Sequence, residues 1–168
     1  MLRPFRSVLP RVNPSAYVDQ SAQVIGDVEI GDESSVWMNV VIRGDVNTIR
    51  IGDRTNIQDG TVIHVMRGTH PTRIGNEVTV GHAAILHGCT IHDRVLIGMG
   101  AIVMDHAVVE KNSLIAAGSV VLENTRVESG SIYAGVPAKK VRELSSEHFE
   151  RLNVRIANNY VMYAEWFR

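Results

Sequence analysis

The stretch that decides the fold is residues 91–127, which read IHDRVL IGMGAI VMDHAV VEKNSL IAAGSV VLENTR V when they are divided into sixes. Every block begins with Ile or Val. The same spacing recurs upstream in three shorter runs of aliphatic residues, over residues 12–42, 51–63 and 74–86. This period is neither the 3.6 residues of an α-helix nor the two-residue alternation of a simple hairpin.

Aliphatic residues that recur every six positions are typical of a parallel β-helix, in which short strands stack coil upon coil. Gly follows several of them, as at Gly31, Gly52 and Gly75, where a sharp turn needs a small residue. The 14 glycines argue against long helices, and the low aromatic content of 5% suits thin repetitive layers. We therefore predict one domain, with an N-terminal segment over residues 1–11 and a β-helix over residues 12–137.

Two segments depart from the repeat. Residues 66–73 place Thr69 where an interior aliphatic residue is expected, which predicts a protruding loop. After the Gly/Pro segment at residues 133–137, a C-terminal α-helix is predicted over residues 143–168, with Ser145 or Ser146 as its N-cap. One apolar stripe should pack it on the outside of the β-helix, and its members are Phe149, Leu152, Ile156, Tyr160, Tyr163 and Phe167.

Charge and cysteine content narrow the function classes. The net charge is -1 and no run of Lys or Arg exceeds two residues, so neither nucleic acid nor a membrane surface is an expected partner. We expect no transmembrane span and no signal peptide. Cys89 is the only cysteine, which excludes an intrachain disulfide and favours a cytoplasmic location with a packing role for the thiol.

Two histidines are predicted to meet on the outside of the β-helix. If residues 66–73 loop out, Leu86 stacks on Ile63 one coil later, and His64 and His87 each follow one of these inward residues. Side chains alternate along a strand, so both imidazoles should point outward, about 4.8 Å apart in rung spacing. Two imidazoles placed in this way can share a metal ion.

A third histidine, His82, falls on the preceding face and cannot easily reach the same ion. A closed three-fold assembly would bring His82 of one subunit against His64 and His87 of the next. Catalytic zinc sites commonly hold three protein ligands and keep a fourth position for water. Iron or cobalt could also accept three imidazoles. Periodicity alone leaves open that these are solvated or interface histidines.

Ordered motifs carry a resemblance to a known family. They are Arg43-Gly-Asp45, Asn56-Ile-Gln58-Asp59-Gly60, His64, Gly81-His82, Leu86-His87-Gly88, Gly135-Val-Pro137 and Asn158-Asn159-Tyr160. Over nearly its whole length the chain resembles the gamma-class carbonic anhydrase-like family of bacterial hexapeptide-repeat proteins, some of which are labelled ferripyochelin-binding. The resemblance implies a single-stranded left-handed parallel β-helix and a homotrimer that binds Zn²⁺ between subunits through the three histidines.

The resemblance also implies roles for five further residues. Gln58 would orient the zinc-bound water, or form an interface hydrogen bond instead. Arg43 would pair with Asp45 and Asp59 and help to bind bicarbonate, and an ion network that joins subunits is the alternative. Tyr160 would lie near the site, although its position in the apolar stripe favours packing equally.

The activity that the resemblance implies is a lyase reaction, the reversible hydration of CO2 to bicarbonate by a metal-bound hydroxide. The archetypal enzyme has a proton-transferring glutamate after its Arg-x-Asp motif and another in an acidic loop. Here Val46 takes the first place, and residues 66–73 contain no Asp or Glu, so that only His70 could carry protons. Hydration is therefore expected to be weak or absent even if metal binds.

Other functions stay open. The same site could hydrolyse a thioester or a small ester, or the chain could be a non-catalytic metal or small-ligand binding protein. A hexapeptide acyltransferase that uses acetyl-CoA is disfavoured, because such an enzyme needs no set of three histidines. The remaining histidines fit no ligand position and are interpreted as structural or solvated: His70, His92, His106 and His148.

Overall fold

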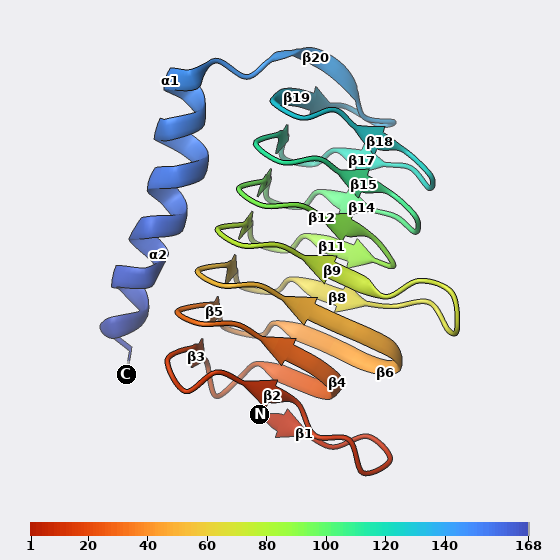
Figure 1. The fold of residues 1–168 in the computed structure, drawn as a ribbon, viewed down its shortest axis with the longest axis vertical. Coiled ribbons are helices and arrows are strands. Elements are labelled where there is room, and N and C mark those ends of the chain that lie inside the picture. Colours follow the sequence, from red (N-terminus) through yellow and green to blue (C-terminus); the bar gives the residue numbers. More distant parts are fainter. Residues whose placement is uncertain (168) are drawn as a thin grey trace.

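The computed structural model describes residues 1–167, apart from the side chain of Arg151. It shows a parallel β-helix with one C-terminal helical segment running alongside (Figure 1). The predicted fold class is confirmed. Arg168, the last residue of the predicted helix, lies outside the described residues.

The strands form two sheets that wrap the three faces of a prism. The 12-stranded sheet covers two faces and consists of β1 (Leu2–Arg3), β2 (Arg11–Val12), β4 (Gln23–Ile30), β6 (Val41–Ile51), β8 (Val62–His64), β9 (Thr72–Ile74), β11 (Ile85–His87), β12 (Thr90–Ile91), β14 (Ile102–Val103), β15 (Val108–Val109), β17 (Val120–Val121) and β18 (Arg126–Val127). The 8-stranded sheet consists of β3 (Tyr17–Val18), β5 (Ser35–Val36), β7 (Asn56–Ile57), β10 (Thr79–Val80), β13 (Leu96–Ile97), β16 (Leu114–Ile115), β19 (Ser131–Ala134) and β20 (Lys139–Glu143).

Two of the faces matter for function. The histidine face is made of β8, β11, β14 and β17 together with the first residues of β6, which pair in parallel register. The helix face is made of β3, β5, β7, β10, β13, β16 and β19, and the C-terminal helix lies beside it. The two faces meet at a corner where five residues in successive coils have left-handed φ angles: Asn39, Gly60, Ala83, Gly100 and Gly118.

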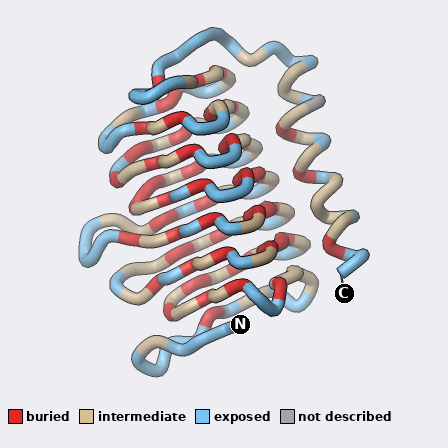
Figure 2. Tube along the Cα trace, turned by 180° about the vertical axis from the view of Figure 1, so that it is seen from behind, coloured by how far each residue is buried: buried red, intermediate tan, exposed pale blue. Residues whose placement is uncertain are grey.

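The core is a stack of inward aliphatic side chains, one from each face of each coil. All the predicted interior positions are buried except Val12 and Val18, which are partly buried at the N-terminal end. Figure 2 shows the resulting alternation of buried and exposed residues around every coil. Each interior residue meets the one about 4.8 Å above and below it, so the repeat itself fills the core without large aromatic rings.

The predicted loop protrudes between β8 and β9, and Figure 1 shows it projecting from the prism. Within it Met66 and His70 form an isolated antiparallel bridge. The hydroxyl of Thr72 donates to the carbonyl of His64 at 2.6 Å, and the Asn47 amide donates to the carbonyl of Met66 at 3.1 Å. The base of the loop is therefore tied to the strand that carries His64.

The β-helix and the C-terminal helix do not meet where the sequence predicts. Tyr133 occupies one more interior position, paired with Ile115, within the predicted range of the β-helix. Residues 139–143 then turn back as β20 and pair antiparallel with β19. The helix consequently begins at Ser146 and not at residue 143. The Ser145 hydroxyl caps it by accepting from the backbone N–H of His148 at 3.3 Å.

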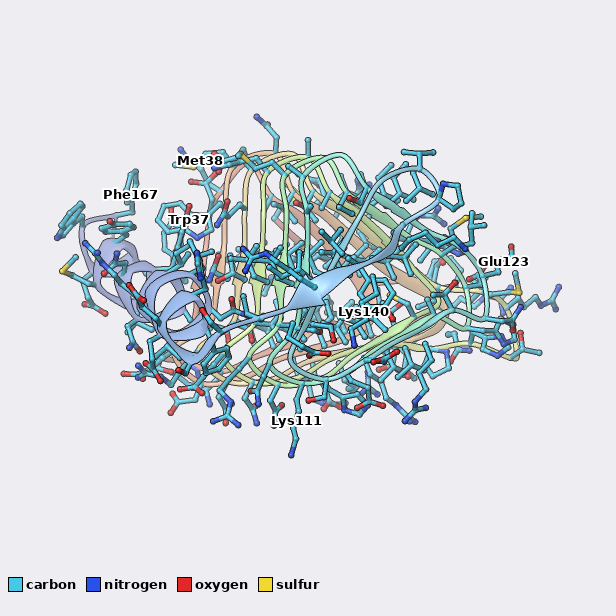
Figure 3. All side chains as sticks on the ribbon, turned by 90° about the horizontal axis from the view of Figure 1, so that it is seen from above. Trp37, Met38, Lys111, Glu123, Lys140 and Phe167 are labelled. Carbon is cyan, nitrogen blue, oxygen red and sulfur yellow. The ribbon has the colours of Figure 1, made fainter. Side chains whose placement is uncertain are left out.

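The helical segment consists of α1 (Ser146–Phe149), a π-helical turn η1 (Glu150–Val154) and α2 (Arg155–Glu165). It runs back along the prism, so that the C-terminus lies beside the first coils (Figure 1). Near the C-terminal end of this segment, the Trp37 ring packs against Tyr160, with ring centroids 5.3 Å apart, and against Phe167, with ring centroids 5.2 Å apart. Figure 3 shows Trp37 and Phe167 beside the helix. Among the described residues, no helix is both long and apolar enough to cross a membrane.

Candidate metal centre

The histidine face brings His64 and His87 together. His64 ends β8, His87 ends β11, and the two residues pair directly in the sheet, as do Ile63 and Leu86 just before them. The predicted register is therefore confirmed. The Nδ1 atom of His64 lies 3.1 Å from the Nε2 atom of His87.

A carboxylate lies behind each of the two imidazoles. The Nε2 atom of His64 lies 3.0 Å from an Asp45 oxygen, and the Nδ1 atom of His87 lies 2.7 Å from an Asp105 oxygen. A carboxylate can only accept, so each ring, when it is neutral, donates its one N–H there and turns its unprotonated nitrogen toward the other ring. Two lone pairs cannot hydrogen-bond to each other, and a cation between them would satisfy both.

The separation of these two nitrogens suits zinc. Two nitrogens bound to one tetrahedral zinc at about 2.0–2.1 Å each lie roughly 3.3 Å apart, close to the 3.1 Å observed. A carboxylate on the outer nitrogen fixes the tautomer and raises the basicity of a metal-binding imidazole. The residues present on this face therefore fit two thirds of a three-histidine zinc site.

Arg43 completes the first group of polar residues. It extends outward from β6 and forms an ion pair with Asp45. Burial alone would raise the pKa of Asp45, but hydrogen bonds from His64 and Arg43, together with the positive charge of Arg43, hold that pKa below its ordinary value. Arg43 thus keeps Asp45 ionised behind His64 while its own guanidinium stays partly exposed.

His82 lies apart from this pair, at the corner between the helix face and the histidine face. Its Nδ1 atom lies 3.0 Å from a carboxylate oxygen of Asp59. The sequence predicted Asp59 as a partner of Arg43, but in this chain Asp59 lies beside His82. Gln58 precedes Asp59, is buried, and donates its amide N–H to Asn56 at 3.0 Å, which fixes the orientation of the side chain.

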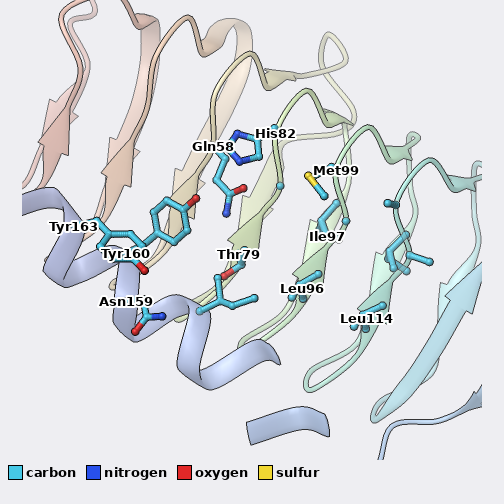
Figure 4. A pocket seen from close by; sticks show the side chains of 16 residues that line it. Gln58, Thr79, His82, Leu96, Ile97, Met99, Leu114, Asn159, Tyr160 and Tyr163 are labelled. Atoms are coloured by element: carbon cyan, nitrogen blue, oxygen red, sulfur yellow. The ribbon is translucent and has the colours of Figure 1, made fainter. Parts of the chain in front are cut away.

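Tyr160 reaches the same corner from α2. Burial, and then the negative charge of Asp59, raise the pKa of the Tyr160 hydroxyl, so it stays protonated. The ring packs edge-on against Trp37 and also lines a groove with Gln58 and His82 (Figure 4). Both predicted roles of Tyr160, packing and proximity to the site residues, are therefore compatible with its position.

The predicted site residues, together with Asp105, thus form two half-sites. The first half-site consists of Arg43, Asp45, His64, His87 and Asp105, and the second consists of Gln58, Asp59, His82 and Tyr160. Within the described part of one chain, no group of three or more His, Cys, Asp or Glu side chains is placed to hold a metal ion. His64 and His87 lie in the first half-site and His82 lies in the second.

Asp105 is the site residue that the sequence reasoning missed. It is 7% exposed. Its only sequence signal is its register. Val103 stacks on Leu86 one coil later, and Asp105 follows Val103 by two residues, which places it near His87. Cys89 is fully buried in a corner, and burial raises the pKa of its thiol to about 12, in keeping with a packing role.

The remaining histidines lie outside both half-sites. The rings of His70 and His106 contact each other, with centroids 3.1 Å apart. His92 lies 3.9 Å from Glu110, and His148 contacts the Ser145 hydroxyl at 2.8 Å. His70 thus projects from the loop toward the coil that carries Asp105.

Comparison with known proteins places this site in a family. Residues 88–123 match the family described as bacterial transferase hexapeptide (six repeats). Protein YrdA of Escherichia coli (strain K12) is 48% identical, over 98% of this chain and 92% of that protein. A carbonic anhydrase of Geobacillus kaustophilus is 44% identical, over 100% of this chain and 91% of the relative.

A plant protein and a solved structure are also similar to this chain. The mitochondrial gamma carbonic anhydrase 1 of Arabidopsis thaliana is 47% identical over 90% of this chain, which spans 56% of that protein. The crystal structure of a hexapeptide transferase family protein from Anaplasma phagocytophilum has a TM-score of 0.95 and 42% identity, covering 100% of this chain and 98% of that one. The chain belongs to the gamma-class carbonic anhydrase-like family of hexapeptide-repeat proteins.

Proposed function

We propose that this protein is a zinc-dependent carbonic anhydrase of the gamma class that works as a homotrimer and interconverts CO2 and bicarbonate. One observation carries the proposal, namely the pair of facing imidazole nitrogens of His64 and His87, each backed by a carboxylate. The carbonic anhydrase relatives that match along the whole chain support the same reaction.

The third ligand in this proposal is His82 of the partner subunit. Support comes from the histidine face itself, which exposes aliphatic side chains beside the two histidines. Val62, Ile85, Ile102 and Val120 pair with one another as one outward ladder. Val62 is 39% exposed and Ile85 is 40% exposed. Apolar patches of this kind mark contact surfaces. A heterologous contact that closes after three subunits would cover the ladder and join the two half-sites.

The chemistry follows from the groups that would meet there. When bound, zinc lowers the pKa of a coordinated water so that a nucleophile forms near neutral pH. The Gln58 amide, held by Asn56, would orient that water with its free carbonyl oxygen. The Arg43 guanidinium, exposed beside Asp45, would attract the bicarbonate anion. Protons would leave to solvent or buffer, because Val46 and residues 66–73 offer no carboxylate.

The direct test is stopped-flow CO2 hydration by the purified, zinc-loaded protein. We expect weak hydration above the uncatalysed rate, because Val46 and residues 66–73 supply no proton-transferring carboxylate, and we expect its loss in His64→Ala together with loss of bound zinc. His148→Ala is the matched control, because His148 lies on the helix cap far from either half-site, and it should keep both properties. Wild-type rates equal to those of His64→Ala would reject the proposed reaction.

The non-catalytic alternative makes a different prediction for the same proteins. A metal-binding or small-ligand binding protein would retain zinc and show no difference in hydration between wild type and His64→Ala. The presence of a groove beside the second half-site favours an enzyme.

A further inference from the structure

A groove runs along the helix face because three consecutive coils lack a large outward side chain. The residues that follow the interior position on this face stack in one column, and they are Trp37, Gln58, Gly81, Gly98, Ala116 and Ala134. Trp37 and Gln58 fill the column at one end. The next three members are two glycines and an alanine, so they leave a depression over β10, β13 and β16.

The walls of this groove are mostly apolar, although Thr79 and Asn159 also line it. Leu96 and Leu114 rise from the sheet, and Tyr163 approaches from α2 (Figure 4). Ile156 of α2 lines the groove as well. The volume of the groove is about 440 Å³, which is within the range of small-molecule sites. Among the described lining residues none is Lys, Arg, Asp or Glu, so the groove offers no charged partner for a phosphate.

One end of the groove is polar, and it is the end that belongs to the second half-site. Gln58, His82 and Tyr160 gather there, while Leu96 and Leu114 lie toward the other end (Figure 4). From Gln58 to Ala116 the column spans three rungs, or about 14 Å. CO2 has three atoms, so a groove of this length provides room that hydration of CO2 does not require.

We propose that the groove binds the acyl chain of a thioester or ester, with its carbonyl group at the Gln58, His82 and Tyr160 end, and that the same site hydrolyses it. A saturated acyl chain matches the narrow aliphatic walls, and an uncharged carbonyl matches the hydrogen-bonding groups at the polar end. This inference rests on the proposed zinc site for the hydrolysis, but the binding of the chain does not depend on it.

The reaction is balanced with water as the only co-reactant. The water oxygen forms a bond to the carbonyl carbon, and the bond from that carbon to the sulfur or oxygen of the leaving group breaks. The leaving thiolate or alkoxide takes up one proton. The products are a carboxylate, a thiol or alcohol, and one proton released to buffer.

The test fills the groove from its floor. Ala116→Leu places a larger side chain over β16, whereas Gly81 and Gly98 cannot be used because an added Cβ would lie 2.7 and 2.4 Å from backbone nitrogens. Ala134→Leu is the matched control, because Ala134 occupies the same column one coil further on and does not line the groove. Ile156→Phe fills the groove from the helix side and serves if Ala116→Leu does not fold.

Two measurements are made on each protein. Octanoate binding to the metal-free protein is followed by calorimetry, and hydrolysis of p-nitrophenyl octanoate is compared with that of p-nitrophenyl acetate by the zinc-loaded protein. We expect the groove-filling variants to weaken octanoate binding and to lower kcat/KM for the octanoyl ester by about tenfold or more. The acetyl ester, zinc content and CO2 hydration should be unchanged, as should every property of Ala134→Leu.

Two results would overturn the inference: octanoate that fails to bind the wild type, or binding that Ala116→Leu and Ile156→Phe leave intact. Failure of the proposed zinc site is distinguishable, because it would abolish zinc binding and CO2 hydration in the wild type while octanoate still bound the metal-free groove and the variants still weakened it.

Discussion

At the scale of single residues, the carboxylates behind the two facing histidines determine what this site can bind. Asp105 is buried and lies 2.7 Å from the Nδ1 atom of His87. Its negative charge fixes the tautomer and makes the other ring nitrogen a better ligand. An amide in its place could still accept the hydrogen bond but would bring no charge.

Asp105→Asn should therefore lower zinc affinity by about 10–100-fold while the proposed trimer stays intact. Competition with a chromophoric chelator measures the affinity. Asp27→Asn is the control, since Asp27 is paired with Arg50 on the surface and should keep wild-type affinity. Equal affinity in Asp105→Asn and the wild type would contradict a role for the carboxylate behind His87.

The sequence predicted His64 and His87 as neighbours but missed Asp105, for one physical reason. The two histidines directly follow interior aliphatic residues, so the repeat alone fixes their direction and register. Asp105 is two residues beyond its interior residue, Val103, where the coil begins to turn and side-chain direction depends on the corner. A search for acidic residues one coil beyond each histidine would have found it.

Cys89 provides a pH-dependent prediction. Burial raises the pKa of its thiol to about 12, above an ordinary value of 9.0. Folding thus favours the protonated thiol, and this contribution is complete below pH 9 and is lost as the pH rises toward 12. We expect no reaction of the native protein with Ellman's reagent at pH 8 and full reaction after unfolding in urea. Rapid native labelling would show that the thiol is accessible.

At the scale of elements, the C-terminal helix packs through residues that its hydrophobic pattern did not predict. The predicted stripe, from Phe149 to Phe167, is only partly buried, and the most buried residues of the segment are Asn153, Ala157 and Ala164. The π-helical turn η1 rotates the packed face relative to a regular helix. Small residues then allow a close approach to the sheet, which hydrophobicity alone does not predict.

Asn153 ties this helix to the β-helix. Its amide donates to the carbonyls of Arg94 and Ser113 at 2.9 and 3.0 Å, from two successive coils. Asn153→Ala should lower the free energy of unfolding by about 1–3 kcal/mol, because the Arg94 carbonyl loses its donor and the Ser113 carbonyl keeps only the backbone N–H of Leu96. Urea denaturation measures this loss. Asn158→Ala, on the exposed side of the same segment, should cost much less, and an equal cost would contradict the tether.

Strand β20 was also beyond prediction. Residues 139–143 read KKVRE and are exposed throughout, so they show neither the alternation nor the apolar content of a strand. They pair with β19 because that strand is the last of its sheet and presents a free edge. Capping the edge with charged residues explains why the helix starts later than the sequence indicates.

At the scale of the whole molecule, the repeat made the fold predictable. The proposed trimer, by contrast, is indicated only by the two half-sites that one chain keeps apart. Stacked coils bury the same kind of residue at the same spacing, so errors at one loop do not alter the rest. The half-sites follow no such period. They are separated within one chain, and His82 faces Asp59 while His64 faces His87.

Mixing subunits tests whether each zinc site combines His64 and His87 of one subunit with His82 of the next. His64→Ala and His82→Ala trimers should each bind no zinc at the site. After co-refolding, every mixed trimer contains one interface with all three histidines and should recover one zinc ion and CO2 hydration. Mixed trimers that stay as empty as the parents would contradict the shared site.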